Sequence, residues 1–237
     1  MPLPASRIRP LDALRAMRAL LRDPDDTAQV FRIVDALSGA TRDRVYRRFR
    51  RTPTGARILQ ERRSLLKTLR DRAALEALPP GSLGRAYAEF VHAERLSADG
   101  LVEASVEGGR TAADDPERRL VGERLRDMHD LWHVVTGYGR DLVGEAALLA
   151  FTYAQTRNPG IGFIVAVAWW RAQGEARPLR GLLRDAYRRG RAAAWLPAAD
   201  WEALLARPLT EVRRELGVGA PAPYAPLRSA GAPRLAT

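Results

Sequence analysis

Two histidines lie close to the carboxylates of Asp130 and Glu145 in the segment MHDLWHVVTGYGRDLVGE, from Met128 to Glu145. The whole chain has only 3 histidines, and two of them, His129 and His133, stand here four positions apart. On a helix this spacing leaves the two rings roughly 40° apart around the axis and one turn apart along it. Two imidazoles in that arrangement can bind one metal ion.

The carboxylates complete a set of mixed nitrogen and oxygen donors. Asp130 lies roughly 100° further around the helix, so it either reaches the metal sideways or holds a histidine in the correct tautomer. Glu145 follows Gly137 and Gly139, and a tight reversal at these glycines would return it to the histidines. Three protein ligands leave a zinc position open for water or substrate, whereas four close the site unless the coordination number is larger.

The choice of metal is limited by the ligand types. The chain has no cysteine, which excludes disulfides, thiolate ligands and a cysteine nucleophile. Neutral imidazoles with carboxylates suit zinc best, and manganese and ferrous iron also accept these donors.

Helical periodicity dominates the elements that must position these residues. Apolar residues recur at three and four positions while sustained alternation is hard to find, which predicts an all-α fold with short loops. The helix from Pro116 carries the histidine pair, and the helix capped by Asp141 carries Glu145. Prolines and capping side chains predict helix starts near Leu11, Asp26, Thr41, Gly55, Ser64, Ser82, Pro116, Asp141, Ile161, Pro178, Pro197 and Pro208.

Two segments do not fit the helical pattern. Residues from Ser97 to Asp115, rich in Gly, Ser and Asp, are predicted to form a long loop. The proline-rich end after Gly217 is predicted to be extended. We see no repeat and no domain linker, so we expect one helical domain over residues 1–224 and a disordered tail over residues 225–237.

The formal net charge of +11 comes almost wholly from arginine, because Lys67 is the only lysine. Charge alone attracts nucleic acid, but no recognition motif accompanies it, so we do not expect a nucleic-acid partner. The densest arginines, between Arg42 and Arg72, alternate with apolar residues at helical spacing. We interpret them as a solvated helix face, with a surface for acidic lipid headgroups or an acidic partner as the alternative.

Neither the amino terminus nor the most apolar run of the chain indicates export or a membrane span. Arginines interrupt every apolar stretch of the amino terminus, which argues against a secretory signal. The most apolar run, from Gly160 to Trp170, is shorter than the roughly 20 residues that cross a bilayer. It could line an apolar cavity or touch a membrane surface.

The histidine and carboxylate motif resembles that of a known family. HDLWHVVTGYGRDLVGE is similar to the signature of the ubiquinone (coenzyme Q) biosynthesis protein 4 family: His-Asp, two residues, His, eleven residues, Glu. LPPGSLGRAYAEFV, from Leu78 to Val91, is similar to another segment of that family, as are TPTGARILQER and PLTEVRRELGVGAPAPY. The resemblance covers roughly residues 52–224.

The resemblance implies an all-helical protein that binds a divalent metal, commonly zinc, through His129, Asp130, His133 and Glu145. It implies a metal-dependent lyase of ubiquinone synthesis that removes the C1 carboxyl group of a polyprenylated 4-hydroxybenzoate-type ring at the membrane surface, with hydroxylation at that carbon also proposed. The expected partners are the prenylated precursor, the membrane surface and other ubiquinone biosynthesis proteins, and a homodimer is a further candidate assembly.

The amino terminus is neither Ser-rich nor free of acids, so we expect a bacterial member on the cytoplasmic face of the membrane rather than one with a mitochondrial leader.

A prenylated ring needs an apolar groove beside the metal. EAALLAFTYA and GIGFIVAVAWW follow the motif directly, and we name Phe151, Phe163 and Trp169 as candidates for a lipid-tail pocket. The alternative is that both helices simply fill the core. A metal-bound water or Tyr138 is the candidate proton donor, and His92 is expected to be structural.

Two rival functions come from other classes. A metal phosphohydrolase also uses adjacent His and Asp, but it normally needs further ligands, and only His92 remains to supply one. A non-catalytic lipid-binding scaffold, which organises the other biosynthetic enzymes, would use the metal only to join two helices.

Overall fold

The computed structural model describes residues 8–94, 103, 105–106, 115–219 and 223–227. Within those residues the chain forms helices and no strands, which confirms the all-α prediction. The first half contains α1 (Pro10–Arg22), α2 (Thr27–Leu37), α3 (Thr41–Arg51), α4 (Pro53–Glu61), α5 (Leu65–Arg70), α6 (Arg72–Glu76) and α7 (Leu83–Ala93). The second half contains α9 (Pro116–Asp127), α10 (His129–Thr136), α11 (Leu142–Thr156), α12 (Pro159–Arg171), α13 (Pro178–Ala192), α14 (Trp201–Leu204), α15 (Leu209–Glu215) and two short 3₁₀ turns, η1 (Gly174–Ala176) and η2 (Leu196–Ala198).

Most helix starts agree with the local signals in the sequence. Ser64, Ser82 and Asp141 each accept hydrogen bonds from the first-turn amides of the helices they precede. Pro178 begins α13 as predicted. At Pro197, however, the chain makes only one 3₁₀ turn, and α14 begins four residues later, capped by Asp200.

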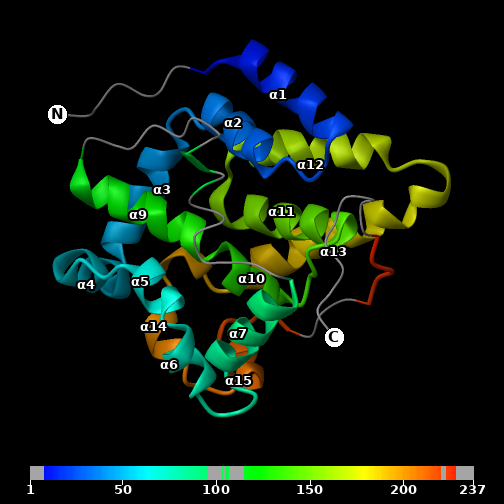
Figure 1. The fold of residues 1–237 in the computed structure, drawn as a ribbon. Helices are drawn as coiled ribbons and strands as arrows, with labels where there is room; N and C mark the ends of the chain where they lie inside the picture. The colour runs from blue at the N-terminus through cyan, green and yellow to red at the C-terminus, as the bar shows by residue number, and fades with distance from the viewer. Residues whose placement is uncertain (1–7, 95–102, 104, 107–114, 220–222, 228–237) are drawn as a thin grey trace.

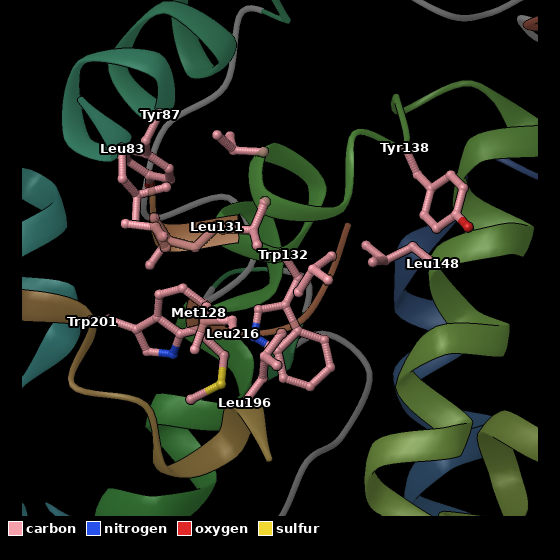
Figure 2. Packing of buried hydrophobic residues seen from close by; sticks show 14 of the residues in the cluster. Leu83, Tyr87, Met128, Leu131, Trp132, Tyr138, Leu148, Leu196, Trp201 and Leu216 are labelled. Atoms are coloured by element: carbon pink, nitrogen blue, oxygen red, sulfur yellow. The ribbon is translucent and has the colours of Figure 1, made fainter. Parts of the chain in front are cut away.

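The predicted helix from Pro116 through the histidines is in fact two helices. It ends at Asp127, and Met128 adopts φ −79° and ψ −3°, which interrupts the α-helical turn before α10 begins at His129. The main-chain amides of Met128 and Trp132 still bond to carbonyls four residues back. Met128 itself is 1% exposed and lies in the core (Figure 2).

Helix α11 lies at the centre of the arrangement (Figure 1), with α13 along one side and α12 along another. Gly190 permits the close approach of α13, because a Cβ atom there would lie 2.7 Å from the Phe151 carbonyl oxygen. Helices α1 and α2 pack together and cover α12 through Met17, Ile33 and Ile164. Helix α11, which carries Glu145, is therefore packed between α13 and the group formed by α12, α1 and α2.

The arginines between Arg42 and Arg72 are largely engaged with the protein itself. Arg42 pairs with Asp35, and Arg63 pairs with Asp200 at 2.7 Å. The Arg48 guanidinium lies 4.2 Å from the centre of the Trp195 ring. These contacts favour the structural interpretation of this cluster.

The predicted loop from Ser97 to Asp115 lies mostly outside the described residues. Residues 223–227, which include three residues of the expected tail, run against the turn between α10 and α11, and the remaining ten lie outside the described residues. None of the described helices combines the length and the apolar character needed to cross a bilayer.

Candidate metal centre

Helix α10 is held at its carboxyl end by two arginines from distant helices. Gly137, at φ 78°, ends the helix in the left-handed conformation that glycine favours. Arg213 on α15 donates hydrogen bonds to the carbonyls of Val134 and Val135, at 2.8 and 2.9 Å. Arg189 on α13 donates to the Thr136 carbonyl at 3.0 Å. These cations satisfy the last carbonyls and oppose the negative end of the helix dipole, so the histidine-bearing helix is fixed in place.

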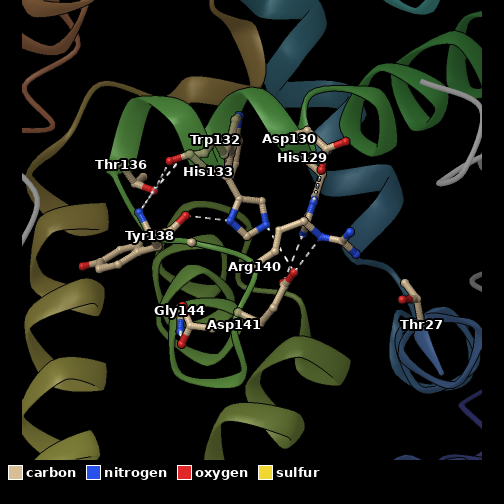
Figure 3. A network of polar contacts seen from close by, with 12 residues as sticks. Thr27, His129, Asp130, Trp132, His133, Thr136, Tyr138, Arg140, Asp141 and Gly144 are labelled. Atoms are coloured by element: carbon tan, nitrogen blue, oxygen red, sulfur yellow. Dashed lines mark hydrogen bonds and ion pairs between the residues drawn. The ribbon is translucent and has the colours of Figure 1, made fainter. Parts of the chain in front are cut away.

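His133 has the protonation geometry of a metal ligand. Its Nδ1 lies 2.8 Å from the Tyr138 carbonyl oxygen, which can only accept, so Nδ1 carries the proton (Figure 3). In the neutral ring Nε2 is then a free lone pair, and this buried atom has no hydrogen-bond partner. The ring is stacked on Phe90 with centroids 5.5 Å apart. A buried imidazole nitrogen that faces a carboxylate without a hydrogen bond is the observation that best fits a bound cation.

His129 and Asp130 stand beside it at the start of α10. His129 Nδ1 lies 3.3 Å from an Asp130 carboxylate oxygen, which leaves His129 Nε2 directed toward Glu145. Ligand atoms of His129, Asp130 and His133 all lie within 4.8 Å of one another. This triad can therefore hold a metal ion, and the contact with His129 equally suits Asp130 as the group that orients that ring.

Glu145, in the first turn of α11, faces both rings. Its carboxylate lies 3.4 Å from His133 Nε2, 3.9 Å from His129 Nε2 and 3.4 Å from Arg140 Nε. Burial disfavours the charged carboxylate, but the two histidines and Arg140 outweigh that cost and hold the pKa of Glu145 at about 2. The acid is therefore ionised at neutral pH, as a metal ligand must be.

The turn that brings Glu145 to the histidines is held by hydrogen bonds from the carboxyl-terminal segment, residues 223–227. The Tyr224 hydroxyl accepts from the Gly139 amide at 2.8 Å and donates to the Asp141 carboxylate at 2.7 Å. The Leu227 amide donates to Asp141 at 3.0 Å, and its carbonyl accepts from Leu142 at 2.8 Å. Asp141 also caps α11 through the amides of Val143 and Gly144. Residues 223–227 thus fix the start of the helix that carries Glu145.

Tyr224→Phe is expected to loosen this turn, because it removes one hydroxyl that joins Gly139 to the capping carboxylate. The expected cost is about 1–3 kcal/mol of unfolding free energy, with metal affinity roughly tenfold weaker, as for other groups that orient ligands. Thermal melting and a zinc titration measure the two effects. Tyr187→Phe is the matched control, since its ring contacts Tyr153 and Arg157 rather than the turn. Unchanged zinc affinity in Tyr224→Phe would contradict the role of this contact.

A cavity of about 750 Å³ adjoins the polar cluster. His129, Arg140 and Glu145 line part of it. Most of the remaining wall is apolar and comes from α2, α11 and α12, including Val30, Phe31, Val34, Leu149, Ile161 and Ile164. This volume is typical of sites for small molecules and cofactors. The candidate metal centre is therefore open to a pocket suited to a largely apolar molecule with a polar end.

The residues named for the lipid-tail pocket lie outside the lining of this cavity. Phe151 is fully buried in the core against Trp132, with ring centroids 6.0 Å apart. Phe163 packs in the cluster between α1, α2 and α12, and Trp169 contacts Arg180 and Arg184. Apolar periodicity identified the two helices but not which of their faces points to the cavity.

The structure also places Tyr138, the candidate proton donor, and His92, which was expected to be structural. The Tyr138 ring points away from the histidines, and Arg189 lies 5.0 Å from its centre, so only its carbonyl serves the site (Figure 3). His92 contacts Arg72 at 2.9 Å and lies on α7 outside the triad. Sequence reasoning did not single out Arg140 or Tyr224. Arg140 lies inside the motif turn, whereas nothing in the local sequence around Tyr224 indicates its partner.

Comparison with known proteins agrees with the geometry. The family model described as "Coenzyme Q (ubiquinone) biosynthesis protein Coq4" matches residues 4–222. "Ubiquinone biosynthesis protein coq-4, mitochondrial" of Neurospora crassa is 34% identical over 170 residues, covering 71% of this chain and 47% of that protein. "Ubiquinone biosynthesis protein COQ4 homolog, mitochondrial" of Rattus norvegicus is 32% identical over 174 residues, covering 73% of this chain and 63% of that protein. The chain therefore spans about half to two thirds of the length of these relatives.

A solved structure shows the same fold. The crystal structure of a putative ubiquinone biosynthesis protein from Nostoc punctiforme PCC 73102 superimposes with a TM-score of 0.66 at 23% identity, over 90% of this chain and 100% of that one. Together with the family match over nearly the whole sequence, this completes the assignment. The chain belongs to the Coq4 family of coenzyme Q (ubiquinone) biosynthesis proteins.

Proposed function

We propose that this protein takes part in ubiquinone synthesis by removing the C1 carboxyl group of a polyprenylated 4-hydroxybenzoate-type ring. The observation that carries this proposal is the shared wall of the cavity, which joins His129 and Glu145 to apolar side chains of three helices. A substrate of this class has a polar, anionic ring and a long apolar tail, and both halves find a matching surface there.

The donors also support a divalent metal in this role, most suitably zinc. The lone pair of His133 Nε2, the ionised Glu145 and the neighbouring His129 and Asp130 form a site of nitrogen and oxygen ligands. When bound, such a metal supplies a Lewis acid that stabilises negative charge developing on the ring.

The chain's own residues would bind and orient the ring. Arg126 and Arg140 both line the cavity, and their guanidinium groups suit the ring carboxylate. The bond between C1 and the carboxyl carbon then breaks, carbon dioxide leaves, and the electron pair stays on the ring until a proton reaches C1. In an oxidative variant, C1 would gain a hydroxyl group from water in place of that proton, with molecular oxygen as the two-electron oxidant and hydrogen peroxide as its reduced product. Apolar side chains such as Leu149 and Ile164 exclude water around the tail.

The test is the chemical structure of the quinone precursors in a strain that lacks this gene. We expect them to retain the ring carboxyl group, and we expect wild-type protein, but not His133→Ala, to restore its loss. Precursors already free of the carboxyl group would contradict decarboxylation. The scaffold alternative predicts a different pattern: metal-site variants would lose stability and assembly with the other enzymes together, and the purified protein would release no carbon dioxide from the prenylated acid.

We further propose peripheral binding to the inner face of the cytoplasmic membrane. This agrees with the lack of a spanning helix among the described residues and with the insolubility of the prenyl tail in water.

A further inference from the structure

We take the mouth of the cavity to be where its exposed lining residues lie, among the residues that the structure describes. Nearly all of its lining residues are buried or half-buried, and those that are exposed lie together at the carboxyl-terminal ends of α1 and α12: Leu21, Pro24, Asp25, Arg171 and Ala176. Because α11 and α12 form an antiparallel hairpin (Figure 1), Glu145 in the first turns of α11 lies on the same side as this mouth. A molecule that enters here reaches the candidate metal centre without leaving the cavity.

Helix α1, at the edge of this mouth, exposes bulky apolar side chains that an ordinary surface helix would bury. It turns small or flexible side chains inward, since Ala13, Ala16 and Met17 are buried. Three of its four leucines face solvent, with Leu11 66%, Leu14 45% and Leu21 43% exposed, whereas Leu20 is half-buried and packs with the core. Soluble proteins seldom expose bulky apolar side chains in a contiguous patch without a partner.

The exposed leucines of α1 form one stripe along the helix. Leu11, Leu14 and Leu21 fall within roughly 80° around the helix axis, at about 100° per residue. Ile8, just before α1, is 57% exposed, and Trp170, at the end of α12, is 69% exposed. We call the surface made by these five residues the α1 face. It holds most of the large exposed hydrophobic side chains among the described residues.

The charges at the α1 face indicate whether its partner is a second copy of this chain or a lipid surface. Helix α1 carries three exposed arginines, Arg15, Arg18 and Arg22, against one aspartate. Arg18 lies within the leucine stripe, and Arg171 follows Trp170 directly. A two-fold contact between copies would bring these arginines toward one another. Lipid phosphates, in contrast, sit beside the acyl chains and pair with such arginines, and tryptophan favours that boundary.

We infer that the α1 face docks on an anionic phospholipid bilayer and brings the mouth of the cavity to the membrane surface. The inference rests on the proposed peripheral membrane binding, to which it adds the surface that makes the contact. The identity of the molecule that enters rests on the proposed decarboxylation. The prenylated precursor would then pass from the bilayer into the cavity without crossing water.

Vesicle binding tests the inference without any turnover. The full-length protein is expected to sediment with vesicles of phosphatidylcholine and phosphatidylglycerol, and more weakly with phosphatidylcholine alone. Leu11→Ser combined with Leu14→Ser is expected to lower vesicle affinity roughly tenfold or more, because two leucines lose their apolar contact. The control is Leu227→Ser, whose side chain is also exposed, at 58%, but lies outside the α1 face. It should bind like wild type.

A second measurement locates the contact. Vesicles with brominated acyl chains quench tryptophans that reach the bilayer, and Trp170→Phe is expected to remove most of that quenching. Full vesicle affinity of the leucine variant, quenching that persists in Trp170→Phe, or absence of vesicle binding by wild type would overturn the inference. So would light scattering that shows a dimer which Leu14→Ser converts to a monomer. Failure of carboxyl loss with vesicle binding intact would refute the proposed function and leave the α1 face standing.

Discussion

His133→Ala is expected to lower metal affinity by more than about 100-fold, because residues that only orient a ligand already change affinity about 10–100-fold. The substitution removes the buried Nε2, which has no hydrogen-bond partner and lies 3.4 Å from the Glu145 carboxylate, and it leaves the Tyr138 carbonyl without its own donor. Elemental analysis of the purified protein and a zinc titration against a competing chelator measure the loss. Visible absorption of a cobalt-substituted sample reports the coordination.

The third histidine provides the control for that experiment. His92→Ala removes an imidazole that contacts Arg72 and belongs to no ligand cluster among the described residues, so metal affinity should stay at the wild-type value. Melting curves recorded with chelator distinguish loss of a ligand from loss of the fold. Wild-type metal content in His133→Ala would refute the centre as assigned.

Metal affinity should also decline as the pH falls. Burial by itself lowers the pKa of His133, but the negative charge of Glu145 outweighs it and raises the pKa above its ordinary value. A metal binds the neutral ring, so protons compete with it at a higher pH than they would at an ordinary histidine.

Gly144→Ala is expected to destabilise the protein by about 2–4 kcal/mol, through overpacking together with a disturbed hydrogen bond. A Cβ atom at Gly144 would lie 2.2 Å from the Gly139 carbonyl oxygen and 2.5 Å from the Tyr224 hydroxyl. The first neighbour is backbone, so the turn itself must shift. Differential scanning calorimetry should show a midpoint lower by roughly 5–15 °C for a chain of this length.

Gly181→Ala is the matched substitution on α13, where an added Cβ atom meets nothing within 4 Å. Both glycines are helical, so helix propensity favours alanine in each case, by roughly 0.5–1 kcal/mol. The control should therefore become slightly more stable. Equal stabilisation of both variants would show that the turn does not hold Tyr224 against Gly144.

The local part of the site could be predicted from sequence. The spacing of His129, His133 and Glu145, with glycines between them, predicted two adjacent helices joined by a reversal, and the structure brings the Glu145 carboxylate within 4 Å of both rings. The helix starts at Ser64, Ser82 and Asp141 were also predicted from the sequence, and these residues cap the helices that follow them. Such features depend on contacts between residues a few positions apart, where periodicity and side-chain chemistry determine the geometry.

Other features depended on the tertiary structure. The motif helix is divided at the buried Met128, although the apolar periodicity continues through it. Tyr224 reaches Asp141 across 83 residues of chain, and Arg213 reaches the end of α10 across a similar interval. Which face of α12 borders the cavity depends on α1 and α2, more than a hundred residues earlier. Sequence periodicity states that a helix has an apolar face, but only the packed neighbours decide whether that face meets a core, a cavity or a membrane.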